Sequence, residues 1–224
     1  MTKPFGGGSS PSVVVAAAVA TSIGVGALSN AERHRAERMS GVRLAGFVSG
    51  RRMLRETCAE LLDVAPESID IGVEPSGRPF VRNQAARPLH LSVSYSGELV
   101  AIAVSLVGPV GIDVEGVRRV SEGVRRWTCS EREMRVLAGL AEVEQECEFI
   151  RLWTMKEAYL KESGRGIRGR LSRLHLGLSA SRAGPTQWRS IRTDNSAWIT
   201  VALRSTERQW ARKIDYRLDT PLPN

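Results

Sequence analysis

Two short acidic segments of this chain carry residues that could bind a metal ion and move a proton. Asp113 and Glu115 are separated by one residue, so in a β-strand their carboxylates point to the same face. Glu157 and Lys161 are four residues apart, which places them one turn apart on one face of a helix. Three carboxylates beside lysine side chains make a site for a hard cation next to a phosphate group. The combination indicates phosphoryl-group chemistry.

Each acidic segment also has an ordinary structural interpretation. Two acids in an Asp-x-Glu pattern are most often solvated at an exposed strand edge. A glutamate and a lysine four residues apart are most often a surface ion pair of small energetic consequence. Neither segment is specific alone, so the elements that would bring them together decide the interpretation.

The predicted elements run from strands to helices and back to strands, with no sequence repeat, which is typical of the α+β class. The hydrophobic pattern predicts helices over 32–39, 42–62 and 142–162, and another that begins near residue 130. It predicts strands over 13–20, 69–73, 80–81, 89–93, 100–106, 110–115, 174–178, 188–192 and 198–203, with a break at 94–97.

The N-terminal segment and the cysteines indicate the cellular compartment of the protein. We interpret the apolar run at 13–20 as a buried first strand rather than a signal peptide, because it is short and soon interrupted by polar residues and glycines. Residues 1–12 are predicted to form a disordered tail and 220–224 an irregular one. The 3 cysteines lack metal-site spacing and predict a reduced, cytoplasmic compartment.

The chain is basic, with 32 lysines and arginines against 24 acids and a net charge of +8. A surplus of this size implies an acidic partner, which could be a nucleic acid, an anionic membrane, a phosphorylated ligand or an acidic protein. The charge by itself does not choose among these.

Five short motifs follow one another along the chain. They are Gly-Arg-Arg-Met-Leu-Arg at 50–55, Gly-Arg-Pro at 77–79, Ser-Tyr-Ser-Gly at 94–97, Gly-Ile-Asp-Val-Glu at 111–115 and Trp-Thr-Met-Lys-Glu-Ala-Tyr-Leu-Lys at 153–161. In this order they resemble the 4'-phosphopantetheinyl transferases of the surfactin-synthetase type, from about residue 28 to about residue 178. The last two motifs are diagnostic as a pair, and the earlier ones support them.

The resemblance implies a holo-[acyl-carrier-protein] synthase. Such an enzyme uses Mg²⁺ to transfer 4'-phosphopantetheine from coenzyme A to a serine hydroxyl of an apo carrier protein, and it releases 3',5'-ADP. The carrier would be an acidic acyl, polyketide or peptidyl carrier protein. The resemblance also implies a monomer of two similar α/β halves, 13–108 and 109–219, related by a pseudo-twofold axis with the active site at their interface. No nucleic-acid or membrane partner is expected.

The resemblance also assigns roles to individual residues. Asp113, Glu115 and Glu157 would hold the Mg²⁺, and Glu157 and Lys161 would be catalytic. Glu157, or a metal-bound water that it orients, would take the proton of the carrier serine. The residues that would bind coenzyme A are Arg51, Arg78, Ser94, Tyr95, Lys156 and Lys161.

Two of these positions depart from the usual family pattern. Tyr95 stands where the family usually has a histidine that contacts the 3'-phosphate of coenzyme A, and Arg78 stands where a lysine is frequent. A tyrosine carries no charge near neutral pH, so we expect arginines, with Arg51 first, to hold that phosphate.

Two other functions are compatible with parts of this sequence. One is a different Mg²⁺-dependent phosphotransferase or nuclease, although nuclease sites often place a lysine two residues after an acid, and Lys161 follows Glu157 by four. The other is a non-catalytic protein that binds nucleic acid through its basic charge. The chain has no recognisable nucleic-acid motif and few aromatic residues for base stacking.

Overall fold

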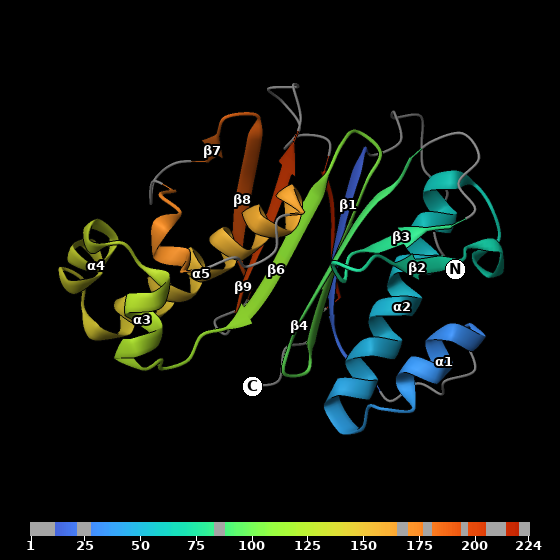
Figure 1. The fold of residues 1–224 in the computed structure, drawn as a ribbon, viewed down its shortest axis with the longest axis horizontal. Helices are drawn as coiled ribbons and strands as arrows, with labels where there is room; N and C mark the ends of the chain where they lie inside the picture. Colours follow the sequence, from blue (N-terminus) through green and yellow to red (C-terminus); the bar gives the residue numbers. More distant parts are fainter. Residues whose placement is uncertain are drawn as a thin grey trace.

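The computed structural model describes residues 12–21, 28–82, 88–164, 170–176, 181–193, 197–204 and 214–219. Two four-stranded sheets pack face to face, and a helix of 22 residues covers the outer face of each (Figure 1). Each half is therefore one sheet with one long helix. This architecture confirms the α+β class predicted from the sequence.

The N-terminal sheet has the strand order β10-β1-β5-β4. Its strands are β1 (Val13–Val19), β4 (His90–Ser96), β5 (Leu99–Ser105) and β10 (Ile214–Asp219). The helix α2 (Gly41–Leu62) packs on its outer face, and α1 (Asn30–Ala36) packs against α2. The short elements between α2 and β4 are η2 (Pro66–Ser68) and the hairpin of β2 (Ile71–Val73) and β3 (Pro79–Val81).

The C-terminal sheet has the strand order β6-β9-β8-β7. Its strands are β6 (Val110–Gly116), β7 (Arg182–Ala183), β8 (Thr186–Thr193) and β9 (Ala197–Arg204). The helix α5 (Glu142–Ser163) packs on its outer face, and three smaller elements lie beside α5: α3 (Glu122–Thr128), α4 (Glu131–Ala138) and η3 (Leu171–Arg173).

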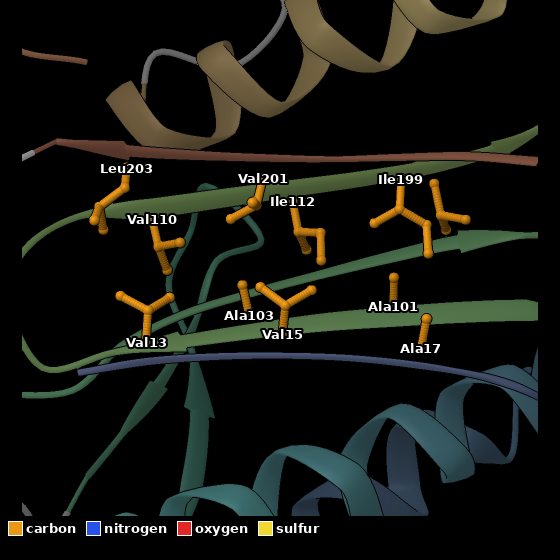
Figure 2. Close-up of a cluster of buried hydrophobic side chains, with 11 residues drawn as sticks. Val13, Val15, Ala17, Ala101, Ala103, Val110, Ile112, Ile199, Val201 and Leu203 are labelled. Carbon is orange, nitrogen blue, oxygen red and sulfur yellow. The ribbon is translucent and has the colours of Figure 1, made fainter. Parts of the chain in front are cut away.

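The main core lies between the two sheets, where alternate residues of β1, β5, β6 and β9 meet (Figure 2). On β6 the side chains of Val110, Ile112 and Val114 point into this core. Because successive residues of a strand face opposite sides, Asp113 must point outward, toward α5. The apolar half of the predicted alternation in 110–115 is thus what turns the acidic half toward the helix.

The helix ends follow local sequence signals. Ser29 and Glu32 form a reciprocal capping box at the start of α1, and Ser130 and Glu133 form another at the start of α4. The helix α5 ends at Gly164, whose φ of 69° suits a residue without a side chain.

Two sequence predictions in the loops were wrong. The segment 94–97 was expected to interrupt the strand, but β4 continues through Ser96 and turns only at Gly97, where φ is 56°. Residues 174–178 were expected to form a strand, but the structure has η3 followed by an irregular segment up to Leu176, and 177–178 lie outside the described residues. Leu174 and Leu176 pack on the α5 core without a strand partner, so their alternation reflects burial rather than pairing.

The last described strand crosses from one half to the other. Residues 109–219 were predicted to form the C-terminal half, but β10 pairs in parallel with β1 at the edge of the N-terminal sheet. Its Arg217 pairs with Glu60 of α2, and its Tyr216 lies against Arg189 of β8. The strand β10 therefore contacts both halves, which a boundary drawn along the sequence cannot describe. The tails 1–11 and 220–224 lie outside the described residues.

Gly111 sets how closely α5 can approach β6. A Cβ atom at this position would lie 2.1 Å from the Ala158 carbonyl oxygen and 2.4 Å from the Glu162 amide nitrogen, both of them backbone atoms. We therefore expect Gly111→Ala to lower the free energy of unfolding by at least about 1–3 kcal/mol, the range for overpacking. Denaturant titration would measure it.

Gly123 of α3 provides the control for this substitution. Its only near neighbour would be the Ser121 Oγ, 3.9 Å away, so Gly123→Ala should be neutral or slightly stabilising. Equal unfolding midpoints for the two variants would show that the α5 contact with β6 is not tight.

Candidate active site

The structure brings the acids of the two segments together at the outer face of β6. Asp113 of β6 and Glu157 of α5 are only 4% and 7% exposed. Burial is the main cause that raises the pKa of Glu157 to about 7, and the charges of Asp113 and Glu115 raise it further. These three carboxylates therefore form one electrostatic cluster, as the sequence pattern suggested.

Asp113 is held by two partners from different elements. Its Oδ1 accepts a hydrogen bond from the Ser94 Oγ of β4 at 2.7 Å and another from the Lys161 Nζ of α5 at 2.7 Å. The Lys161 Nζ also donates to the Ser94 Oγ at 2.9 Å. The three side chains form a closed triangle in which the ammonium group offsets the charge of the buried carboxylate. Desolvation still dominates and raises the pKa of Asp113.

Glu115 lies at the more open end of the cluster. Its Oε2 accepts a hydrogen bond from the Ser96 Oγ of β4 at 2.7 Å and pairs with Arg118 at 2.9 Å. One strand of the N-terminal sheet thus orients both acids of β6, through Ser94 and Ser96.

The donor atoms of this cluster fit a hard divalent cation such as Mg²⁺. The Asp113 Oδ2 and the Glu157 Oε1 are buried and have no hydrogen-bond partner among the described residues. Buried carboxylate oxygens without a partner are costly, and a bound cation with oxygen ligands would satisfy them. Within the described part of the chain, no three Asp, Glu, His or Cys side chains are already arranged as a complete metal site.

The raised pKa of Glu157 predicts that the stability of the metal-free protein depends on pH. The folded state binds a proton that the unfolded chain, with a pKa of 4.5, has already released. The contribution of neutral Glu157 is therefore complete below about pH 4.5 and is lost as the pH rises through about 7. In EDTA, the melting temperature of the wild type should fall relative to that of Glu157→Gln between about pH 5 and about pH 7.5. A constant difference over this range would contradict the shift.

Lys156, which was predicted to bind coenzyme A, does not contact the cluster in the structure. Its side chain is fully buried on another side of α5, and its Nζ donates to Glu133 at 2.7 Å, to the Thr128 carbonyl at 2.8 Å and to the Leu171 carbonyl at 3.2 Å. Residues 156 and 157 are adjacent on a helix and so point in directions about 100° apart. Lys156 ties α5 to α3, α4 and η3.

Arg51 and Tyr95 lie close together, as expected for a shared site, but Arg51 is nearly enclosed. Its Nε lies 3.6 Å from the Glu32 Oε1, and its guanidinium is 5.2 Å from the centre of the Phe47 ring. Its Nε and Nη1 have no hydrogen-bond partner among the described residues. Arg51 therefore has donors to spare for an anion but little exposed surface, and its role in binding phosphate stays a prediction.

Tyr95 lies over α2, where glycines make room for it. A Cβ atom at Gly50 would be 2.7 Å from the Tyr95 Oη, and one at Gly46 would be 3.4 Å from the ring. The residue as a whole remains 42% exposed. Burial of the phenol raises its pKa, so the group is neutral near pH 7 and can act only as a hydrogen-bond partner.

Arg78 reaches across from the N-terminal half to the C-terminal end of α5. Its Nη2 donates to the carbonyls of Lys161 and Glu162, where a cation favourably meets the end of the helix dipole. Arg78, Lys161 and Gly164 line a pocket of about 180 Å³ together with apolar residues that include Leu91 and Leu160. Positive charge from both halves therefore meets in one pocket.

Sequence comparison relates this part of the chain to known proteins. A sequence profile described as the 4'-phosphopantetheinyl transferase superfamily matches residues 109–216, which include the whole carboxylate cluster. Residues 109–216 are therefore similar in sequence to the 4'-phosphopantetheinyl transferase superfamily.

Several curated 4'-phosphopantetheinyl transferases are similar to the chain. HetI of Nostoc sp. is 31% identical over 160 residues, which are 70% of this chain and 65% of HetI. Psf-1 of Bacillus pumilus is 33% identical over 130 residues, 58% of this chain and 54% of the relative. AcpT of Salmonella typhi is 31% identical over 135 residues, which are 58% of this chain and 64% of AcpT. The chain thus spans about half to two thirds of the length of these relatives.

Sequence reasoning missed residues that shape this candidate site without matching a diagnostic position. Ser92 and Ser96 flank Ser94 at alternate positions of β4, and the Ser92 Oγ accepts a hydrogen bond from the Ile112 amide at 3.0 Å. Together the three serines connect β4 to β6. Their spacing of two residues was a visible signal, because a strand places such residues on one face.

Glu162 was also missed, and it holds the last turn of α5. Its buried carboxylate accepts hydrogen bonds from the Arg204 Nε at 2.7 Å and the Thr186 Oγ1 at 2.9 Å. This anchors the helix turn that carries Lys161 to β8 and β9. No local pattern distinguishes Glu162 from an exposed helix acid, since both partners lie far along the chain.

Proposed function

We propose that this chain is a 4'-phosphopantetheinyl transferase of the surfactin-synthetase type. It would transfer the 4'-phosphopantetheine group of coenzyme A to a serine hydroxyl of an apo carrier protein and release 3',5'-ADP. The observation that carries the proposal is the buried cluster of Asp113 and Glu157, with one unpartnered oxygen on each and with Lys161 beside it. The similarity of residues 109–216 to the 4'-phosphopantetheinyl transferase superfamily supports it.

Glu157 is the proposed general base. A base works best when its pKa lies near the operating pH, and without a metal ion burial beside Asp113 and Glu115 raises the pKa of Glu157 to about 7. A bound cation would lower this pKa. Glu157 would take the proton of the carrier serine as the serine oxygen bonds to the β-phosphorus of coenzyme A. The bond between that phosphorus and the bridging oxygen breaks, and 3',5'-ADP leaves with the electron pair.

Lys161 and Arg78 are the proposed partners of the pyrophosphate. Both line the pocket between the halves, and the Lys161 side chain is 31% exposed. Positive groups fixed where negative charge develops stabilise a transition state more than the ground state. Asp113, Glu115 and Glu157 would hold Mg²⁺, which when bound supplies charge neutralisation for the pyrophosphate.

The setting of the reaction is part of the proposal. A monomer suffices, because β4, β6 and α5 of one chain provide the site. Cys58, Cys129 and Cys147 are free thiols, which fits a cytoplasmic location. No helix in the described part of the chain has the length and apolar character needed to cross a membrane. The partner would be an acyl, polyketide or peptidyl carrier protein, and the net charge of +8 favours an acidic one.

Mass spectrometry of a purified apo carrier incubated with the protein, coenzyme A and Mg²⁺ tests the proposal. The carrier should gain the mass of one phosphopantetheine group, and EDTA should prevent the gain. A variant of the carrier with alanine in place of its acceptor serine should not be modified. No mass gain on any acyl, polyketide or peptidyl carrier would reject the proposed activity.

A further inference from the structure

A second, larger pocket lies beside α5, away from the pocket at the junction of the halves. It has a volume of about 890 Å³ and is formed by α3, α4 and the segment around η3. Its lining includes five charged residues and a histidine, namely Arg126, Glu131, Arg132, Arg135, Arg170 and His175. Met134 and Cys129 give it an apolar part.

Three arginines of this pocket differ from most arginines that the structure describes. Arg132, Arg135 and Arg170 are exposed, and their side chains have no ion-pair or hydrogen-bond partner within the described ranges. On α3, by contrast, Arg125 pairs with Glu146 at 2.8 Å, and Arg126, which also lines the pocket, pairs with Glu122 at 3.1 Å. Unpaired positive charges in a concave surface produce a focused positive potential that attracts an anionic partner.

The pocket is rigidly connected to the candidate active site. Lys156 binds the Thr128 carbonyl at the end of α3, Glu133 of α4 and the Leu171 carbonyl of η3, so one buried side chain joins all three elements that form the pocket. The next residue along α5 is Glu157. A partner held in the pocket would therefore keep a fixed position relative to Glu157.

We propose that this pocket is the docking surface for an acidic face of the protein substrate. The inference rests on the proposed function, under which that substrate is the apo carrier. A protein fits better than a nucleic acid, because the lining has no Phe, Tyr or Trp on which a base could stack. Acidic side chains of the partner would pair with Arg132, Arg135 and Arg170, and an apolar side chain would contact Met134.

Neutralising the two arginines of α4 tests the surface. In Arg132→Gln with Arg135→Gln, kcat/KM for the apo carrier should fall about tenfold or more at low ionic strength, and its salt dependence should weaken. The KM for coenzyme A at saturating carrier should stay unchanged. Arg182→Gln with Arg192→Gln removes the same charge from β7 and β8, outside the pocket, and should behave as the wild type.

Binding measured without transfer separates this inference from the proposed activity. Calorimetry would use carriers with alanine in place of the acceptor serine and, in parallel, a single-stranded oligonucleotide. Weaker carrier binding in the α4 double variant, but not in the control, supports the docking surface even if no transfer is seen. Equal carrier binding by wild type and α4 variant overturns it even if transfer occurs. A loss confined to the oligonucleotide would also overturn it, in favour of a nucleic-acid partner.

Discussion

Glu157→Gln should lower kcat for phosphopantetheine transfer by about 10²- to 10⁴-fold, the range for loss of a general base. The amide keeps the size of the side chain but cannot take the serine proton, and it is a weaker ligand for a hard cation. The fold should survive, because at neutral pH the variant no longer confines a third carboxylate beside Asp113 and Glu115. Single-turnover assays with a fixed carrier would measure the loss.

Glu148→Gln is the matched control, since Glu148 lies on the same helix, outside the carboxylate cluster, and pairs with the neighbouring Arg151. It should retain nearly full activity. If the turnover of Glu157→Gln were within a few-fold of that of the control, Glu157 would not be the general base and would be, at most, a positioning residue.

Lys156→Ala should destabilise the protein by about 3–5 kcal/mol, the range for breaking one side of a buried ion pair. The substitution would leave the buried Glu133 carboxylate and the carbonyls of Thr128 and Leu171 without the ammonium donor that all three share. Guanidinium denaturation would show the loss as a lower midpoint. If Lys156 instead contacted coenzyme A, the variant would raise the KM for coenzyme A at unchanged stability.

A second substitution checks the cause. The single variant Lys156→Met should lose stability for the same reason as Lys156→Ala. Adding Glu133→Leu to Lys156→Met removes both charges and should recover part of the stability that Lys156→Met loses, since an apolar pair can replace a buried ion pair. The double variant would still lack the capping contact of Glu133 with the Ser130 amide, so recovery should be incomplete. Purely additive losses in the two single variants and the double variant would contradict the ion pair.

The sequence predicted the main elements well wherever periodicity was strong and local. The strand at 13–20 and the helices at 42–62 and 142–162 appear as β1, α2 and α5, with ends within one or two residues. The pattern at 110–115 also predicted which side chains of β6 are buried in the core, because alternation follows directly from strand geometry.

The path of β10 and the segment after η3 could not be predicted in this way. Pairing of β10 with β1 joins residues about 200 positions apart, and nothing in either segment specifies that partner. Leu174 and Leu176 show the reverse case, in which local alternation suggested a strand and burial against α5 accounts for it. Long-range contacts decide such segments, and sequence patterns report only local preference.

In the candidate site, too, some features follow from local sequence and others from long-range contacts. The sequence by itself determined that Asp113 and Glu115 share one face of a strand and that Glu157 and Lys161 share one face of a helix, because strand and helix periods are properties of the backbone. These spacings suit the binding of a cation. Only the tertiary structure decided that Ser94 and Lys161 share one oxygen of Asp113, that Lys156 turns to Glu133, and that Arg78 meets the end of α5. Those contacts depend on the distance between α5 and β6, which Gly111 allows, and on the side-by-side placement of β4 and β6.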